Sequence, residues 1–246
     1  MRLKSNNPVY SRIMNSDEYQ SYAGEYTAAT YGGVARKAMF FIALVFIGAF
    51  GGLWLMENNP ALFINALIIS LLTSFIFALL GMVVPRLTKI FGSLYCLGQG
   101  MLIGVVSLAF EAEAPGIVMT ALLSVVVVLA VTVTLFITNV VKVNGRFLRF
   151  LMVFAISMIF SLLLIRIVDL IFGGAIFSTL LIPISALSTF LATLYLFFDL
   201  QRVYQIVEGG APASLEWNVA FGLVYVLIWL FIEILRLLFI LGVNRD

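Results

Sequence analysis

The chain has 246 residues, of which 63% are hydrophobic and only 11% are charged, and its formal net charge is +2. About a quarter of the residues in a typical soluble domain are charged and just under half are apolar, so this composition excludes an ordinary soluble domain. Most of the apolar residues lie in blocks of roughly 18 or more, long enough to cross a hydrocarbon core of about 30 Å as a helix. The sequence therefore predicts an all-α, polytopic membrane protein.

Histidine is absent, and Cys96 is the single cysteine. The absence of histidine removes a common zinc ligand, the usual general base near neutral pH, and every Ser-His or Cys-His catalytic pair. One cysteine cannot form an intramolecular disulfide or a CxxC motif. Basic and acidic residues nearly balance, and no basic helix face is long enough to follow a phosphate backbone. We therefore expect no enzyme activity, no cofactor and no nucleic-acid partner.

The first apolar block follows a polar segment, residues 1–37, which we interpret as a cytoplasmic N-terminal arm without a secretory signal. Residues 38–242 are predicted to form the transmembrane domain and residues 243–246 a short C-terminal tail. Seven helices are expected within the domain, at residues 38–56, 61–84, 90–110, 116–141, 148–172, 175–198 and 218–241. Pro183 alone lies within a predicted helix, where it is expected to cause a kink.

Lysine and arginine are concentrated on one side of this predicted topology. With the N-terminus in the cytoplasm, the inner side carries eleven basic residues: Arg2, Lys4, Arg12, Arg36, Lys37, Arg86, Lys89, Lys142, Arg146, Arg149 and Arg202. The outer side carries three: Arg166, Arg236 and Arg245. Because cytoplasmic connections of membrane proteins are rich in Lys and Arg, this distribution predicts a cytoplasmic N-terminus and an outer C-terminus.

Small residues recur at helical spacing on three of the predicted helices. Apolar contact drives little association within lipid, so such stripes indicate faces where helix backbones approach closely. They are Gly48 and Gly52 on the first helix, Gly92, Cys96, Gly100 and Gly104 on the third, and Ser178, Ser185, Ser188 and Ala192 on the sixth.

The last stripe continues through Tyr195 to Asp199, which places this carboxylate on the inner face of the sixth helix. Glu216 begins the last helix, and Glu233 lies about four turns further, three residues before Arg236. An acidic side chain at membrane depth costs about 2.5–3.5 kcal/mol on insertion scales, so it usually pairs, lines a hydrated path or takes up a proton. A local pair explains Glu233 and Arg236 as well as a functional role does. The only local partner of Asp199 is Arg202, which we expect in the following connection.

Several short motifs resemble the bacterial YccA-like branch of the Bax inhibitor (transmembrane Bax-inhibitor-motif) family. They extend in order over nearly the whole chain, and together they are specific although each is weak alone. In the C-terminal part they are Phe198-Asp199-Leu200-Gln201, Ala211-Pro212, Leu215-Glu216-Trp217, Ala220-Phe221-Gly222-Leu223 and Trp229-Leu230-Phe231-Ile232-Glu233-Ile234-Leu235-Arg236. In the N-terminal part they are Asn7-Pro8, Ala29-Thr30-Tyr31-Gly32-Gly33-Val34, Pro85-Arg86, Leu94-Tyr95, Phe110-Glu111 and Pro115-Gly116-Ile117-Val118.

The resemblance implies seven helices with the last one central, in the plasma membrane of a bacterium. It also implies a pH-sensitive calcium leak, or modulation of a membrane protease or of cell death. In channel-like members an aspartate of the sixth helix pairs with one of the seventh, and an arginine after the second helix latches onto the pair. Asp199 matches the first aspartate and Arg86 the latch. Val226 stands at the position of the second aspartate, so the usual carboxylate pair is absent.

Two hypotheses follow. In the first, the protein is a Ca²⁺ leak channel in which Asp199, Glu216 and Arg86 form a cytoplasmic gate opened by protonation of Asp199. Glu233 with Arg236 is then an ion or proton station within the membrane, and Asp199, Glu216 and Glu233 are candidate transient Ca²⁺ ligands. In the second, the protein does not conduct ions and docks through its helices and N-terminal arm to a membrane protease or another complex. A proton-coupled transporter of a small solute is a third possibility, without a substrate signature.

Overall fold

The computed structural model describes residues 27–172 and 175–243. These residues form seven long α-helices and one short 3-10 helix, η1, and the part of the chain described contains no β-strand. All seven long helices are long and apolar enough to cross a membrane, which confirms the predicted fold class. They are α3 (Tyr31–Asn58), α4 (Pro60–Val83), α5 (Thr88–Glu113), α6 (Ile117–Ile137), α7 (Gly145–Phe172), α8 (Ala175–Glu208) and α9 (Glu216–Val243), with η1 (Ala213–Leu215) between the last two.

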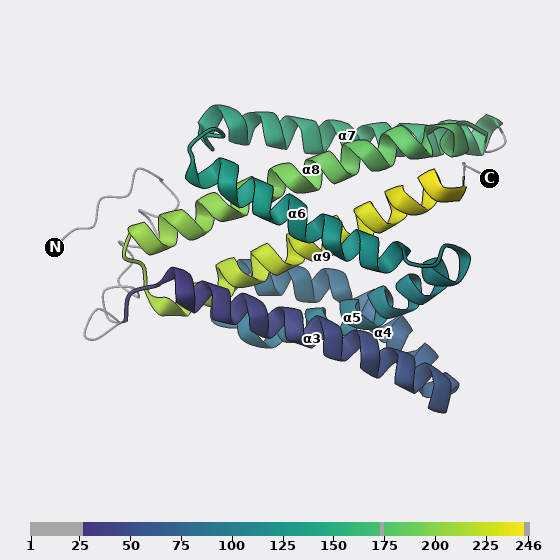
Figure 1. Ribbon diagram of the computed structural model, residues 1–246, viewed down its shortest axis with the longest axis horizontal. Coiled ribbons are helices and arrows are strands. Elements are labelled where there is room, and N and C mark those ends of the chain that lie inside the picture. The colour runs from purple at the N-terminus through teal and green to yellow at the C-terminus, as the bar shows by residue number, and fades with distance from the viewer. Residues whose placement is uncertain (1–26, 173–174, 244–246) are drawn as a thin grey trace.

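The last helix lies in the centre of the bundle (Figure 1). It packs against α3, α4, α5, α6 and α8, whereas α7 packs mainly against α8 on the outside. Consecutive helices run in opposite directions because the connections are short. The expectation of a central last helix is therefore met, with α7 on the outside of the bundle.

Most of the predicted helix ends lie within about four residues of the observed ones, and the start of α3 and the end of α8 differ more. The helix α3 begins at Tyr31, where the side chain of Thr30 accepts a hydrogen bond of 2.9 Å from the backbone N–H of Gly33. The predicted boundary at residue 37 thus falls within α3, and residues 1–26 of the predicted arm lie outside the described residues.

The helix α8 continues ten residues beyond its predicted end, to Glu208. Its 34 residues span about 51 Å at 1.5 Å per residue, so its last turns extend beyond a hydrocarbon core of about 30 Å. The prediction that Arg202 lies in a connection is therefore wrong, because polar residues outside lipid can prolong a helix that a hydropathy criterion ends early. Arg202 lies one turn after Asp199 on the same helix.

Glycines bring α3 and α5 into backbone contact. A Cβ atom at Gly48 would collide with the carbonyl of Leu97, and one at Gly100 would collide with the carbonyl of Val45. A Cβ at Gly104 would lie 2.9 Å from the carbonyl oxygen of Ala49. The predicted small-residue stripes on these two helices therefore do face each other, and Cys96 is buried in the same region.

Around the N-terminal half of α9, the core is largely aromatic. The ring of Phe221 packs edge-on against Phe41 and Tyr95, with centroids 5.6 and 5.5 Å away. It fits because Gly81 of α4 and Gly92 of α5 have no side chain there: a Cβ at either would lie 2.8 or 2.9 Å from the ring. This contact sets how closely α4 and α5 approach α9.

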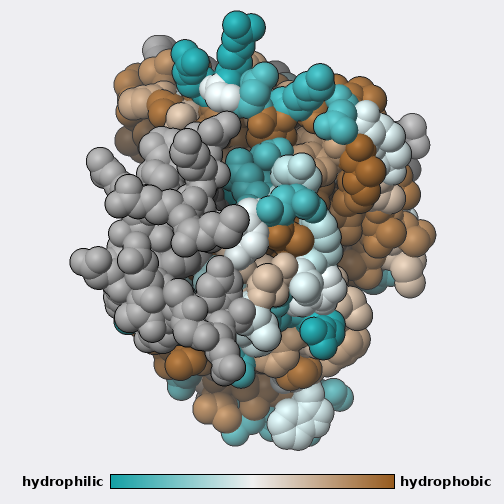
Figure 2. Space-filling model, turned by 90° about the vertical axis from the view of Figure 1, so that its left-hand side faces the viewer, coloured by the Kyte–Doolittle hydropathy of each residue, from teal (hydrophilic) through white to brown (hydrophobic). Residues whose placement is uncertain are grey.

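The charged residues are concentrated at one end of the bundle. Figure 2 looks onto this end, where hydrophilic side chains gather. It carries the start of α3, the connection from α4 to α5, the start of α7 and the connection from α8 to α9 (Figure 1). Among the described residues, this end holds Arg36, Lys37, Arg86, Lys89, Lys142, Arg146, Arg149 and Arg202.

The glycine contact between α3 and α5 can be tested on a single helix. We expect Gly48→Ala to lower the free energy of unfolding by about 1–3 kcal/mol, as overpacking of a close contact does. Gly51→Ala is the matched control, because a Cβ at Gly51 meets no atom within 4 Å and alanine favours helix. Thermal unfolding of the purified variants measures both effects, and equal midpoints would contradict the contact.

Candidate functional site

Asp199 is a buried carboxylate on the face of α8 that packs against α9. Its side chain is 7% exposed, and its ion-pair partner is Arg202, one turn further along the helix. The Nη1 atom of Arg202 lies 3.5 Å from Oδ1 of Asp199, longer than a typical N–H···O hydrogen bond of about 2.7–3.2 Å. Burial of a carboxylate with so little compensation is costly, so this group is poised to take up a proton or a cation.

Arg202 is held in turn by Asn218 of α9. The amide oxygen of Asn218 accepts a hydrogen bond of 3.0 Å from Nη2 of Arg202. The amide nitrogen of Asn218 donates to the carbonyls of Gly81 and Met82, at 3.2 and 2.9 Å, where α4 ends. The ion pair on α8 is therefore connected through one buried amide to α9 and to the end of α4.

The beginning of α5 belongs to the same network. The hydroxyl of Thr88 is fully buried and donates a hydrogen bond of 2.7 Å to the carbonyl of Gly81. Gly222 of α9 lies against the ion pair, since a Cβ there would be 3.3 Å from Oδ1 of Asp199 and 3.4 Å from Nη1 of Arg202. Four helices thus meet around Asp199 and Arg202.

Arg86, which the resemblance implies as a latch on Asp199, follows α4 and is exposed, and its role as a latch stays a prediction. The described ion-pair partner of Asp199 is Arg202. Arg202 reaches this position because α8 continues past Asp199 as a helix. The counter-charge therefore comes from the same helix as the carboxylate.

Glu216 has other partners, at the N-terminal end of α9. Its carboxylate accepts hydrogen bonds from Nζ of Lys37 at 2.5 Å and from the backbone N–H of Thr30 at 2.7 Å. Lys37 also donates to the carbonyl of Ala213 at 2.9 Å. A Cβ at Gly33 would collide with the Glu216 carboxylate, so the start of α3 lies directly against this pair.

The residues before α3 are tied to the connection between α8 and α9. Ala28 and Pro212 form an isolated antiparallel bridge. The N–H of Ala29 donates to the carbonyl of Ala211 at 2.7 Å, and the N–H of Ala213 donates to the carbonyl of Thr27 at 2.9 Å. We call residues 27–30 the strap, because they join the first helix to the start of the last.

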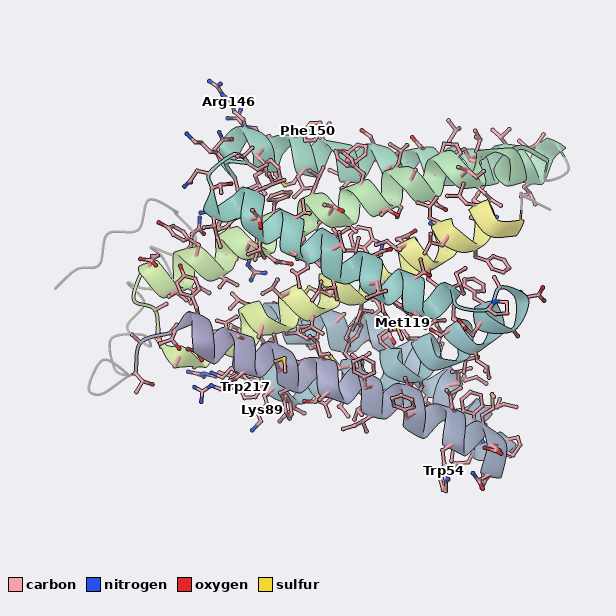
Figure 3. The ribbon with its side chains drawn as sticks, in the orientation of Figure 1. Trp54, Lys89, Met119, Arg146, Phe150 and Trp217 are labelled. Carbon is pink, nitrogen blue, oxygen red and sulfur yellow. The ribbon has the colours of Figure 1, made fainter. Side chains whose placement is uncertain are left out.

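The ring of Trp217 lies beneath two lysines at the same end. Nζ of Lys37 is 5.3 Å and Nζ of Lys89 5.2 Å from the ring centroid, on residues of α3 and α5. Figure 3 shows Trp217 and Lys89 beside each other. These cation–π contacts and the Glu216 pair fix the start of α9 against α3 and α5.

Glu233 is buried further along α9 and has two local partners. Its side chain is 10% exposed and forms an ion pair with Nη2 of Arg236. It also accepts a hydrogen bond of 3.2 Å from the indole N–H of Trp229. The structural pair considered from the sequence is therefore present, although it leaves open a second role for the carboxylate.

A cavity of about 490 Å³ brings Asp199 and Glu233 to one space between α7, α8 and α9. Its polar and aromatic lining includes Tyr195, Arg202, Tyr225 and Trp229, and α7 contributes apolar side chains. Val226 also lines it and is buried, so the position of the missing second aspartate faces the same space. The cavity separates α7 from α9, which explains why α7 packs mainly on α8.

The other two carboxylates of the predicted site each have a basic partner of their own. Glu216 is paired with Lys37 and Glu233 with Arg236. Within residues 27–172 and 175–243, no group of three Asp, Glu or Cys side chains is arranged to hold a metal ion. The three candidate Ca²⁺ ligands therefore do not form one three-carboxylate site.

Two residues of the site, Lys37 and Asn218, were not predicted from the sequence. Arg202 was expected in a connection and not on the same helix as Asp199. Lys37 and Glu216 are separated by 179 positions, and nothing in a single sequence pairs residues that far apart. Asn218 could have been predicted as a site residue, because an amide at the start of an apolar helix requires hydrogen-bond partners when it is buried.

Comparison with protein families gives one match. A family described as Bax inhibitor 1 like matches residues 7–242. The match covers all seven helices and both carboxylates of the cavity. A search of curated proteins finds no match to this chain.

The Glu216–Lys37 pair generates a prediction about stability. We expect Glu216→Gln to lower the free energy of unfolding by about 3 kcal/mol, because removal of one partner leaves the other charge poorly compensated. Lys37→Met should have the larger effect, since it leaves the 5% exposed carboxylate of Glu216 without a counter-charge, whereas the 19% exposed side chain of Lys37 can be partly solvated when Glu216 is replaced. The double variant should lose less than the sum of the two. Thermal unfolding measures all three, with the exposed Glu57→Gln as control. Strict additivity would show that the two side chains do not interact.

Proposed function

Because the chain belongs to the Bax inhibitor 1-like family, we propose that it is a slow, pH-sensitive cation leak, with Ca²⁺ as the physiological ion. We further propose that it belongs to the bacterial YccA-like branch and lies in the plasma membrane. The observation that carries the proposal is Asp199, a buried carboxylate that opens onto a cavity and has one distant counter-charge. The motifs around this residue support the assignment to the branch.

In this proposal, protonation of Asp199 opens the path. The charged carboxylate attracts Arg202, which Asn218 ties to the end of α4. Neutralisation of the carboxylate removes this attraction and loosens the junction of α8, α9 and α4 at the cytoplasmic end. The leak is therefore expected to increase as the pH falls. The other titratable or charged groups that line the cavity are Tyr195, Arg202, Tyr225 and Glu233.

Glu233 is the second station on the proposed path. It lies seven residues beyond Val226, about 10 Å further along α9, and it lines the same cavity as Asp199. A carboxylate oxygen suits a hard cation such as Ca²⁺, and Arg236 can hold the site closed when no cation is present. Glu216 is assigned a structural part in the gate, because its pair with Lys37 fixes the start of α9.

The orientation proposed has the N-terminus in the cytoplasm and the C-terminus outside. It is supported by the basic residues at the end of the bundle where α3 and α9 begin. The proposal requires no enzyme activity, no cofactor and no nucleic-acid partner; the partners are protons, a cation and the lipid bilayer.

The second candidate function is that of a non-conducting interaction protein. It is favoured by the strap, whose backbone hydrogen bonds to residues 211–213 form an ordered surface at the end of the bundle that carries the basic residues. In this function, that end of the bundle contacts a membrane protease or another complex.

The leak is tested with the purified protein in liposomes that contain a calcium-sensitive dye. We expect Asp199→Asn, which mimics the neutral carboxylate, to conduct at neutral pH at the rate the unaltered protein reaches at low pH. It should also lose the pH response. Glu208→Gln is the matched control, since this exposed carboxylate near the same end bonds Tyr31 and does not line the cavity. If Asp199→Asn keeps the flux and the pH response of the unaltered protein, the assignment of the gate is wrong.

Deletion of residues 1–26 separates the two candidate functions. The leak should persist because the deletion leaves the strap and all residues that line the cavity. Co-purification with a membrane partner should be lost if the second function is the true one. Flux and co-purification are measured on the same preparations, and loss of flux upon deletion would contradict a leak confined to the helical bundle.

A further inference from the structure

The cavity contains a carboxylate, Asp199, that has few hydrogen-bond donors among the described residues. Asp199 is 7% exposed, and in the described part of the chain its only charged partner is Nη1 of Arg202 at 3.5 Å. Arg202 directs its Nη2 atom to Asn218 instead, at 3.0 Å. Buried carboxylates in proteins ordinarily accept hydrogen bonds from several donors. We therefore expect a molecule in the cavity to donate a hydrogen bond to Asp199.

Aromatic rings surround the space next to this carboxylate. Tyr195, Tyr225 and Trp229 line the cavity, and the rings of Tyr195 and Trp229 lie 5.7 Å apart. The faces of such rings attract ammonium groups, and a carboxylate combined with several aromatic rings is a recurring arrangement for binding them. The polar end of the cavity therefore suits a cationic nitrogen.

The opposite wall is apolar and belongs to α7. It is formed by Ala155, Met158, Ile159 and Leu162. Ile159 is 58% exposed on the surface of the bundle, on a helix that packs mainly against α8. A molecule dissolved in the bilayer can therefore reach the cavity along α7 without crossing the centre of the bundle.

A second cavity, of about 270 Å³, extends the first between α7 and α8. Met158 and Leu162 line both cavities, and Pro183, Ile184 and Leu187 line the second from α8. Its lining is almost entirely apolar. The two cavities together form an amphipathic site, with Asp199 and the aromatic rings in one part and space for an alkyl chain in the other.

We propose that this site binds an amphipathic ammonium, a positively charged amine carried on a single alkyl chain and dissolved in the membrane. The ammonium donates hydrogen bonds to Asp199 and lies against Tyr195 and Trp229, and the chain lies along α7 and α8. The larger cavity alone, at about 490 Å³, has the size of sites that enclose small-molecule ligands. The inference uses the same site as the proposed leak but does not depend on conduction.

Binding can be measured through Trp229, which lines the cavity. Trp54 and Trp217 are the other two tryptophans, and the variant Trp54→Phe/Trp217→Phe leaves Trp229 as the only indole. The probe is dodecylamine brominated on its chain, added to the full-length protein in phosphatidylcholine vesicles at neutral pH. We expect saturable quenching of the Trp229 fluorescence by the amine, and only weak, non-saturable quenching by the alcohol of the same brominated chain.

Two further substitutions test the two parts of the site. Asp199→Asn should weaken binding of the amine about tenfold or more, as expected for loss of a charge-assisted hydrogen bond. Leu162→Phe places a larger side chain in the apolar part without adding a second indole, and it should weaken binding although Asp199 is intact. Glu208→Gln should leave it unchanged, as this residue does not line either cavity.

Equal quenching by the amine and the alcohol, or unchanged affinity in Asp199→Asn, would overturn the inference. The calcium flux is measured on the same vesicles without the probe. Binding of the amine without a calcium leak would refute the proposed function and support this inference. A calcium leak without binding of the amine would refute this inference and support the proposed function.

Discussion

A polar group buried among apolar helices must find a partner inside the bundle, and α9 carries three such groups. Glu216 finds Lys37 and the strap, Asn218 finds Arg202 and the end of α4, and Glu233 finds Arg236 and Trp229. The partners of Glu216 and Asn218 come from other helices, so these two groups also fix their neighbours against α9, whereas Glu233 is satisfied within α9 itself. The central position of the last helix thus follows from its polar residues as much as from its apolar ones.

Asp199 is the exception to this constraint. It lies opposite Gly222 of α9, and its counter-charge is shared with Asn218. Where the resemblance implies a second aspartate, Val226 makes that part of the cavity wall apolar and gives Asp199 no carboxylate with which to share a proton. In the proposed leak, control by pH therefore rests on Asp199 alone, and Arg202 and Asn218 rather than a carboxylate pair carry the response to the bundle.

The sequence predicts well what depends on local composition and spacing. The seven helices, the contact of Gly48 with the stripe containing Gly100, and the burial of Asp199 and Glu233 all follow from patterns within one helix. The sequence predicts poorly where a helix ends outside the membrane and which residues far apart in the chain form pairs. Hydropathy ends α8 before Arg202 although the helix continues, and no local pattern joins Lys37 to Glu216.

The account as a whole rests on Asp199 being the carboxylate that takes up a proton. Infrared difference spectra of the protein in lipid vesicles, recorded between neutral and acidic pH, detect the C=O stretch of a newly protonated, buried carboxyl group. The account predicts that such a band appears in the unaltered protein, persists in Glu216→Gln and disappears in Asp199→Asn. Persistence of the band in Asp199→Asn would contradict it.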